Sequence, residues 1–137
     1  MGKKRVVLDT NIIISAFGWG GKPEEIIKKV IDKELELVIS TKQLAELRNV
    51  LEYPRLKFDE SKKERILSLV STISTIIVAK GKVDFVKSDP DDNIILEPAC
   101  HMKVDYIITG DKKHLLPLRK FKDAEIVSPD EFLKKIT

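Results

Sequence analysis

The sequence predicts a three-layer α/β fold, with a central, mostly parallel sheet of about four or five strands and helices on both faces. Short apolar runs rich in β-branched residues alternate with longer segments of helical periodicity. This alternation favours right-handed strand–helix–strand crossovers, which put helices on both faces of a parallel sheet. The length of 137 residues is near that of one domain, and no repeat or linker interrupts it, so we expect a single domain over residues 1–137.

Strands and helices are expected to alternate along the chain. The first strand, residues 5–9, is short, apolar and β-branched, which is typical of a buried parallel strand. The other expected strands are 36–39, 75–79, 105–109 and 125–127. The expected helices are 11–17, 23–33, 40–53, 59–74, 91–102 and 128–136.

Two of these helices share the same start signal. Ser40 with Gln43, and Ser128 with Glu131, fit the capping box, in which each of the two side chains accepts a hydrogen bond from the other residue's backbone amide. Pro129 also suits the first turn of a helix, because it has no amide hydrogen to leave unpaired. We therefore expect helices to begin at these two serines.

Two features of the helical segments leave alternatives open. Asp59 and Ser61 are both suitable first residues for the helix that runs to about residues 71–74. Pro98 falls inside the helix expected from Asp91, where it removes a backbone donor and crowds the carbonyl of Ile94. Either that helix kinks at Pro98, or its opening turn is irregular.

Composition and charge exclude some classes of protein. A net charge of +3 and a pI near 8.9 permit nucleic-acid binding but do not indicate it alone. No apolar run approaches the roughly 18 residues needed to cross a membrane, and the basic start Lys3–Arg5 leads into a strand-length run, unlike a signal peptide. The single cysteine, Cys100, excludes an intramolecular disulfide, and we expect it to be a small buried residue. These features predict a cytoplasmic protein with no membrane contact.

Two segments far apart in the chain set an acidic residue at the end of an apolar strand. Asp9 ends the first strand, and Asp111 follows the strand at 105–109. Parallel strands share one crevice at their carboxyl ends, and ligands bind there. Carboxylates brought together repel unless a cation neutralises them, and hard divalent cations prefer oxygen ligands. We therefore expect a metal or catalytic role for both acids, with a helix cap and a turn residue as the alternatives.

Further polar residues belong to the same candidate site. Asp92 lies in an acidic turn at 88–92, and the apolar residues at i+3, i+4 and i+7 direct its helix face toward the core. Asn11 and Thr109 stand beside the two strand-end acids, where they could orient a carboxylate or a water. A cap or turn role explains Asn11 equally well. On pattern alone, Glu46 has the features of a solvated helix residue.

The order and spacing of these residues resemble the PIN domain, a family of metal-dependent ribonucleases that includes many toxins of toxin–antitoxin pairs. The matching segments are, in order, Val7–Asn11, Glu46, Asp89–Glu97 with Asp92 as the acid, and Asp105–Asp111. No single motif is specific, but the order and spacing together are. The resemblance extends over about residues 5–130, which is nearly the whole chain.

This resemblance implies a PIN-like fold and a metal-dependent endoribonuclease, with Mg²⁺ or Mn²⁺ as cofactor and RNA as substrate. It implies metal ligation by Asp9, Asp92 and Asp111, and a role for Glu46 as a ligand or as the base that orients water. A toxin of this kind would have a small antitoxin protein as its partner. We also expect a homodimer or higher homo-oligomer. Trp19, which stands between glycines, is a candidate either for such a contact or for stacking on a base.

Other functions stand as alternatives. A PIN-like module that binds RNA or a partner without cutting would keep the fold, although the retained acids argue against it. A phospho-acceptor receiver domain would need a lysine after a late strand, where Val127–Pro129 offers none. A phosphatase with an Asp-x-Asp motif is disfavoured, because Asn11 occupies the position of the second acid.

Overall fold

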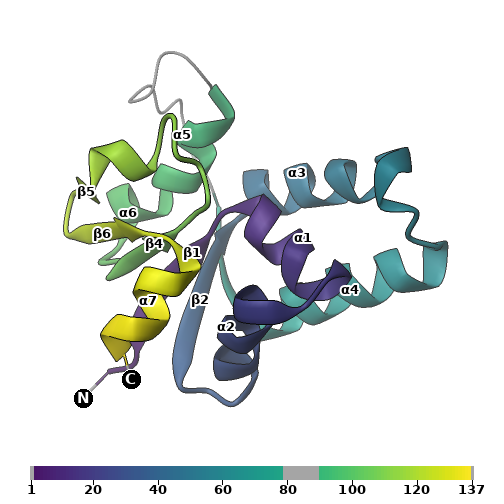
Figure 1. Ribbon diagram of the computed structural model, residues 1–137, viewed down its shortest axis with the longest axis horizontal. Helices are drawn as coiled ribbons and strands as arrows, with labels where there is room; N and C mark the ends of the chain where they lie inside the picture. The colour runs from purple at the N-terminus through teal and green to yellow at the C-terminus, as the bar shows by residue number, and fades with distance from the viewer. Residues whose placement is uncertain (1, 79–89, 137) are drawn as a thin grey trace.

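The described residues form a six-stranded sheet in the order β3-β2-β1-β4-β6-β5 (Figure 1). The computed structural model describes residues 2–78 and 90–136, and the side chains of residues 90–92 lie outside that description. β1 is central and pairs in parallel with β2 on one side and with β4 on the other. β3 and β6 extend the parallel sheet outward, and β5 pairs antiparallel with β6. The predicted α/β fold with a mostly parallel sheet is therefore confirmed.

The strands fall within one or two residues of the predicted ones, with one addition. They are β1 (Lys4–Leu8), β2 (Leu35–Ser40), β3 (Ser74–Ile77), β4 (Tyr106–Ile108), β5 (Lys120–Phe121) and β6 (Ala124–Val127). The sequence did not predict β5, which has two residues and pairs with β6 across a tight turn. A strand of this length is too short to show the alternation of apolar and polar residues that identifies strands in sequences.

The helices occupy the predicted segments, with one division. They are α1 (Thr10–Gly18), α2 (Gly21–Ile31), α3 (Thr41–Leu51), α4 (Glu60–Ile73), α5 (Pro90–Leu96), α6 (Pro98–His101) and α7 (Pro129–Ile136), with short 3₁₀ turns η1 (Pro54–Leu56) and η2 (Leu116–Leu118). The carboxylate of Asp59 accepts a hydrogen bond from the Lys62 amide at 2.7 Å, so Asp59 is the cap of α4. Pro98 divides the predicted 91–102 helix and takes the first position of α6, where a missing amide hydrogen costs little.

One of the two expected capping boxes is complete. Ser128 and Glu131 accept each other's amide hydrogens, at 3.2 and 3.1 Å. Ser40 accepts a hydrogen bond from the Gln43 amide at 3.0 Å, but the Gln43 side chain donates to the carbonyl of Leu8 at 2.6 Å. The second half of that predicted box was therefore wrong, because the buried Gln43 side chain crosses to β1 and does not turn back to Ser40.

Two apolar clusters fill the two faces of the sheet. Val6 and Leu8 point to one face, which α1, α2, α3, α4 and α7 cover, and Val7 points to the other, which α5 and α6 cover (Figure 1). The three predicted layers are thus present. Cys100 is exposed, so the expectation that it is buried was wrong; it lies in the last turn of the short helix α6, past the packed residues of α5. Among the described residues, no helix combines the length and apolar character needed to span a membrane.

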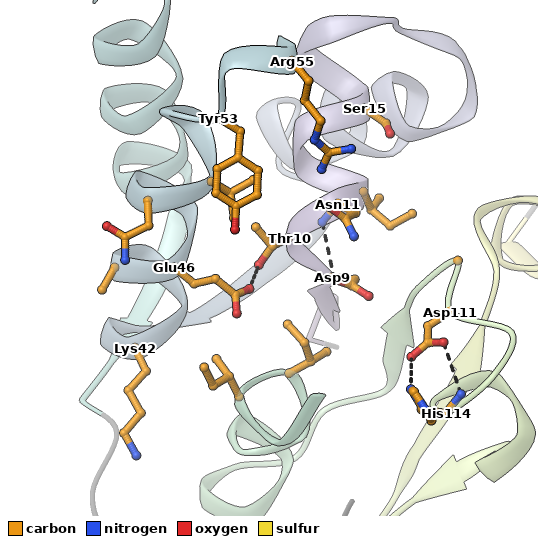
Figure 2. A pocket seen from close by; sticks show the side chains of 17 residues that line it. Asp9, Thr10, Asn11, Ser15, Lys42, Glu46, Tyr53, Arg55, Asp111 and His114 are labelled. Atoms are coloured by element: carbon orange, nitrogen blue, oxygen red, sulfur yellow. Dashed lines mark hydrogen bonds and ion pairs between the residues drawn. The ribbon is translucent and has the colours of Figure 1, made fainter. Parts of the chain in front are cut away.

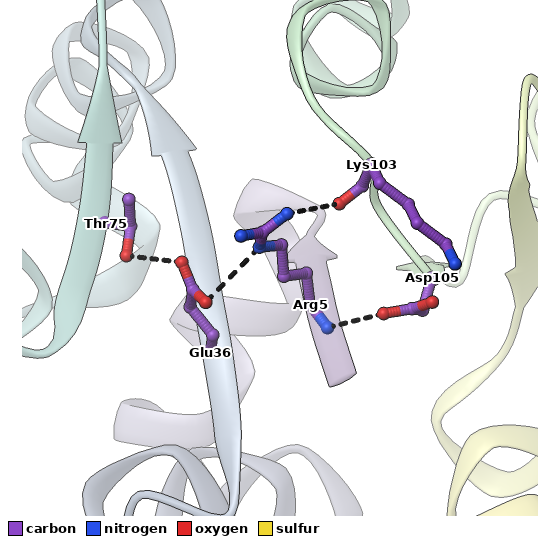
Figure 3. A network of polar contacts seen from close by, with 5 residues as sticks. All are labelled: Arg5, Glu36, Thr75, Lys103 and Asp105. Carbon is purple, nitrogen blue, oxygen red and sulfur yellow. Dashed lines mark hydrogen bonds and ion pairs between the residues drawn. The ribbon is translucent and has the colours of Figure 1, made fainter. Parts of the chain in front are cut away.

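A polar network ties the amino ends of four strands together (Figure 3). The Arg5 side chain bonds Glu36 on β2 at 3.3 Å, and Glu36 accepts a hydrogen bond from Thr75 on β3 at 2.9 Å. The amide of Arg5 also donates to the carboxylate of Asp105, just before β4, at 2.9 Å. These contacts fix the strand register at the edge opposite the carboxyl ends. The acids discussed below lie at the carboxyl ends and take no part in this network.

Candidate active site

Asp9 and Asp111 follow the two central strands at their carboxyl ends. β1 and β4 are parallel neighbours, with Leu8 opposite Ile108. The amide of Asp9 donates to the carbonyl of Ile108 at 2.9 Å, which continues the pairing one residue past β1. The two acidic segments, which lie about a hundred positions apart in the sequence, therefore leave the sheet side by side.

A single buried hydroxyl joins these two segments. Thr109 is fully buried, and its Oγ1 donates to Asp9 Oδ2 at 2.7 Å. The same oxygen accepts a hydrogen bond from the Asp111 amide at 3.0 Å. Thr109 thus fixes the direction of the Asp9 carboxylate and the start of the Asp111 turn, and its role in a metal or substrate site stays a prediction.

Burial and charge both act on the Asp9 carboxyl. Its pKa is raised above the ordinary 3.8, mainly because burial penalises the charged form, and the nearby charge of Asp111 adds to the rise. Hydrogen bonds from Thr109 and from the Asn11 amide oppose the rise and lower the pKa. Without a cation, an ionised Asp9 beside a second acid therefore lowers the stability of the folded state. A site of this kind favours the binding of positive charge.

Asp9 also caps α1, which is the helix-cap role that the sequence offered as the alternative to a metal role. Asp9 Oδ1 accepts a hydrogen bond from the Asn11 amide, but the distance of 3.4 Å is long for such a bond. Capping and ligation are therefore compatible, because the first oxygen is only weakly engaged. The Asn11 residue itself is exposed and lines the cleft described below.

Backbone amides hold the Asp111 carboxylate in a turn. Asp111 Oδ1 accepts hydrogen bonds from the amides of Lys113 at 3.0 Å and His114 at 3.2 Å. The His114 imidazole lies 3.6 Å from the other carboxylate oxygen, and this contact is an ion pair only when the imidazole is protonated. Asp111 thus serves as the turn residue that the sequence also allowed, and its carboxylate still faces the cleft (Figure 2).

Glu46 reaches the site through a chain of buried polar groups that starts on its own helix. Gln43, one turn earlier on α3, donates to the Leu8 carbonyl at 2.6 Å and lies 3.5 Å from the Thr10 hydroxyl. The Thr10 hydroxyl donates in turn to the carboxylate of Glu46 (Figure 2). Thr10 and Gln43 are both buried. Glu46 is therefore held toward the end of β1, although its sequence pattern alone suggested a solvated residue.

These residues surround one open cleft of about 1030 Å³. Its walls come from α1, α3, η1, α5 and the turn after β4 (Figure 2). The lining residues are Asp9, Thr10, Asn11, Ile12, Ser15, Lys42, Ala45, Glu46, Asn49, Val50, Tyr53, Arg55, Ile94, Ile95, Gly110, Asp111 and His114. The structure thus brings Asp9, Glu46 and Asp111 to one cavity at the carboxyl edge of the sheet.

Asp92 is the remaining acid of the predicted set. Its backbone belongs to α5, and Ile94 and Ile95 of the same helix line the cleft. The Asp92 side chain and the whole of Asp89 lie outside the described residues. Within the residues whose side chains are described, no group of three or more acids, histidines or cysteines is close enough to hold a metal ion. The placement of Asp92 therefore stays a prediction from the sequence.

The chemistry of the described donors fits a hard divalent cation. Asp9 and Asp111 offer carboxylate oxygens and no sulfur, which suits Mg²⁺ or Mn²⁺ better than softer metals. Burial, and to a smaller extent the charge of Asp111, raises the pKa of Asp9, and a bound cation would offset both effects by stabilising the ionised carboxylate. Mg²⁺ is commonly held by only one or two carboxylates together with substrate phosphates. Two described acids are therefore compatible with such an ion.

Sequence reasoning missed four contributors to this site. Thr10 and Gln43 position Glu46, and Tyr53 and Arg55 form the wall of the cleft beyond α3. No local sequence signal marked Gln43, because its side chain contacts Leu8 and Thr10 on other elements. Trp19 is 68% exposed and does not line the cleft; its ring lies 6.3 Å from that of Phe58.

Comparison with known proteins agrees with this architecture. A family model described as PIN domain matches residues 5–113. VapBC2 from Rickettsia felis, solved bound to a DNA fragment from their promoter, aligns with a TM-score of 0.62 at 17% identity, covering 90% of this chain and 98% of that chain. PAE2754 from Pyrobaculum aerophilum aligns with a TM-score of 0.61 at 17% identity, covering 96% and 88%. At such identities the two structures share the fold. No curated protein matches this sequence.

Proposed function

This chain belongs to the PIN domain family, and from that premise we propose that it is a divalent-metal-dependent ribonuclease that hydrolyses phosphodiester bonds in RNA. One observation carries the proposal: Asp9 and Asp111, joined by the Thr109 hydroxyl, stand at the carboxyl ends of adjacent parallel strands in an open cleft. Parallel α/β sheets bind their ligands at this edge. In this proposal residues 1–137 act as one domain.

Asp9, Asp111 and Asp92 would hold Mg²⁺ or Mn²⁺. When bound, such an ion lowers the pKa of an attacking water and offsets negative charge on the phosphate. Thr109 keeps Asp9 aimed at the cleft, and the amides of Lys113 and His114 keep Asp111 in place. These contacts reduce the reorganisation that the reaction would otherwise require.

Glu46 would orient the attacking water and accept its proton. Its carboxylate is partly buried and receives the Thr10 hydrogen bond, so one of its oxygens is fixed. A positioned carboxylate of this kind typically contributes a factor of about 10²–10⁴ to a rate as a general base. Asn11, which is exposed and lines the cleft, would contact the substrate.

We further propose that the protein is the toxin of a toxin–antitoxin pair. The shared fold of VapBC2 from Rickettsia felis, solved bound to a DNA fragment from their promoter, supports this proposal. The proposed partner is a small antitoxin, the proposed location is the cytoplasm, and the proposed assembly is a homodimer or higher homo-oligomer. A neighbouring gene for a small antitoxin would be the most direct support for the pairing.

Incubation of the purified protein with labelled single-stranded RNA and with transfer RNA tests the enzyme assignment. We expect cleavage in Mn²⁺ or Mg²⁺, and none after chelation with EDTA. Absence of cleavage of every RNA, despite measured Mn²⁺ binding, would instead support a PIN-like module that holds RNA or a partner without cutting it. The acid variants that sharpen this test are described in the Discussion.

A further inference from the structure

We propose that Tyr53 and Arg55 form a nucleotide-binding subsite for single-stranded RNA, at the opposite end of the cleft from His114. The Tyr53 ring would stack on a base and the Arg55 guanidinium would bind a phosphate next to the one that is cut. This inference rests on the proposed ribonuclease function and assigns the cleft residues that would hold the strand next to the cut.

The position of the two residues provides the first argument. Tyr53 and Arg55 follow α3 directly, in and just before η1, and both side chains line the same cleft as Asp9 and Glu46 (Figure 2). The cleft volume of about 1030 Å³ is slightly above the roughly 300–1,000 Å³ of pockets that hold drug-sized ligands. The cleft therefore has room for more than the reacting phosphate alone.

The chemistry of the pair provides the second argument. The Arg55 guanidinium lies 5.6 Å from the centre of the Tyr53 ring, which is a cation–π contact. Tyr53 is 47% exposed, so its side chain keeps surface that a ligand can contact beside Arg55. An exposed aromatic ring beside an arginine is the combination by which proteins hold unpaired bases and their phosphates. A paired base inside a duplex has no free face to offer to Tyr53.

Charge complementarity provides the third argument. Lys42 and Arg55 are the permanent cations among the cleft residues. The Lys42 ammonium lies 3.6 Å from the buried carboxylate of Glu97, which offsets its charge. No carboxylate of the described residues lies within ion-pair distance of Arg55, and its contact there is the Tyr53 ring. Arg55 is therefore the cleft cation whose charge is available to a polyanion.

Fluorescence anisotropy with a labelled single-stranded RNA, in EDTA, tests the subsite without catalysis. The Tyr53→Ala variant is expected to weaken binding about 5- to 150-fold, the usual loss for removing one stacked aromatic side chain, whereas Tyr53→Phe keeps the ring and should bind like the wild type. The Arg55→Ala variant should lower the slope of log affinity against log salt by about 0.7, the value for one phosphate contact on a single strand, and Arg55→Lys should restore it. A blunt duplex of the same sequence should bind more weakly than the single strand.

Arg48 supplies the matched control. It is an exposed arginine on α3 that does not line the cleft, so Arg48→Ala removes the same charge without touching the proposed subsite. Wild-type affinity and salt slope in both Tyr53→Ala and Arg55→Ala would overturn the inference, and so would an equal loss in Arg48→Ala. The wild type could also bind RNA without ever cutting it. If the subsite variants then lost binding, the result would support the subsite and reject the ribonuclease assignment.

Discussion

At the scale of single residues, burial and the charge of Asp111 raise the pKa of the Asp9 carboxyl above its ordinary 3.8. A carboxyl that holds its proton more tightly in the folded state makes the fold more stable while it is protonated. This stability is fully present below pH 3.8 and is lost as the pH rises through the raised pKa, because the unfolded chain ionises first. At neutral pH, metal-free protein therefore carries a penalty from Asp9.

The Asp9→Asn variant should remove that penalty. In metal-free buffer it should be more stable than the wild type at neutral pH, and this advantage should shrink as the pH falls toward 3.8. Urea unfolding of both proteins between pH 4 and pH 7 measures the difference, and the subtraction cancels the contribution of the other titrating groups. A wild type that is more stable than Asp9→Asn at pH 7 would contradict this reading of the site.

Variants of Glu46 and of Thr10 test the catalytic role of Glu46 and the hydrogen bond that holds its carboxylate. The Glu46→Gln variant should lose a factor of about 10²–10⁴ in kcat if Glu46 accepts the proton of the attacking water. The Thr10→Val variant keeps Glu46 but removes the hydroxyl that holds it, and we expect a loss of about 10- to 100-fold. Steady-state cleavage rates measure both effects. Full activity in Glu46→Gln would show that the role belongs to a different residue.

Much of this site was predictable from single residues, and the limits have physical causes. Asp9, Asp111 and Thr109 follow apolar strands, so the strand-end rule places them together without coordinates. The buried Thr10 and Gln43 contacts could not be predicted, because they depend on how α3 packs against β1, and a sequence does not show which side chains meet across elements.

At the scale of helices and strands, local sequence signals predicted some element ends correctly and others only in part. The complete capping box at Ser128 and Glu131 could be predicted because its two residues are only three positions apart in the sequence. At Ser40 the same signal was only half right, because tertiary contact with β1 drew the Gln43 side chain away. The short strand β5 was missed because its pairing with β6, and not its own composition, creates it.

The start of α4 gives a direct test of one such signal. Asp59 accepts the Lys62 amide at 2.7 Å, whereas Ser61 lies inside the first turn of the helix. The Asp59→Ala variant should therefore lose about 0.5–2 kcal/mol of unfolding free energy. Ser61→Ala changes an exposed side chain that does not make the cap hydrogen bond, so it should stay within about 0.5 kcal/mol. Denaturant unfolding measures both, and the reverse order would move the helix start to Ser61.

For the whole protein, metal binding should appear as added stability. An ion that binds the folded state alone stabilises it by about 2.7 kcal/mol at a concentration one hundred times its dissociation constant. Thermal melts with and without Mn²⁺ should therefore show a rise in Tm for the wild type, and EDTA should reverse it. Asp9→Asn and Asp111→Asn should lose most of that rise. Equal shifts in the wild type and in both variants would place the ion elsewhere on the protein.

Cleavage of single-stranded RNA, followed for the wild type and its acid variants with and without EDTA, tests the account most directly. We expect the wild type to cut in Mn²⁺ and to stop in EDTA, and Asp9→Asn, Asp92→Asn and Asp111→Asn each to cut no faster in Mn²⁺ than the wild type does in EDTA, while remaining folded. Glu36→Gln, which changes a carboxylate at the opposite edge of the sheet, is the matched control and should cut normally. Cleavage that survives EDTA, or that survives the loss of Asp9 and of Asp111, would contradict the proposal that these carboxylates hold a catalytic metal.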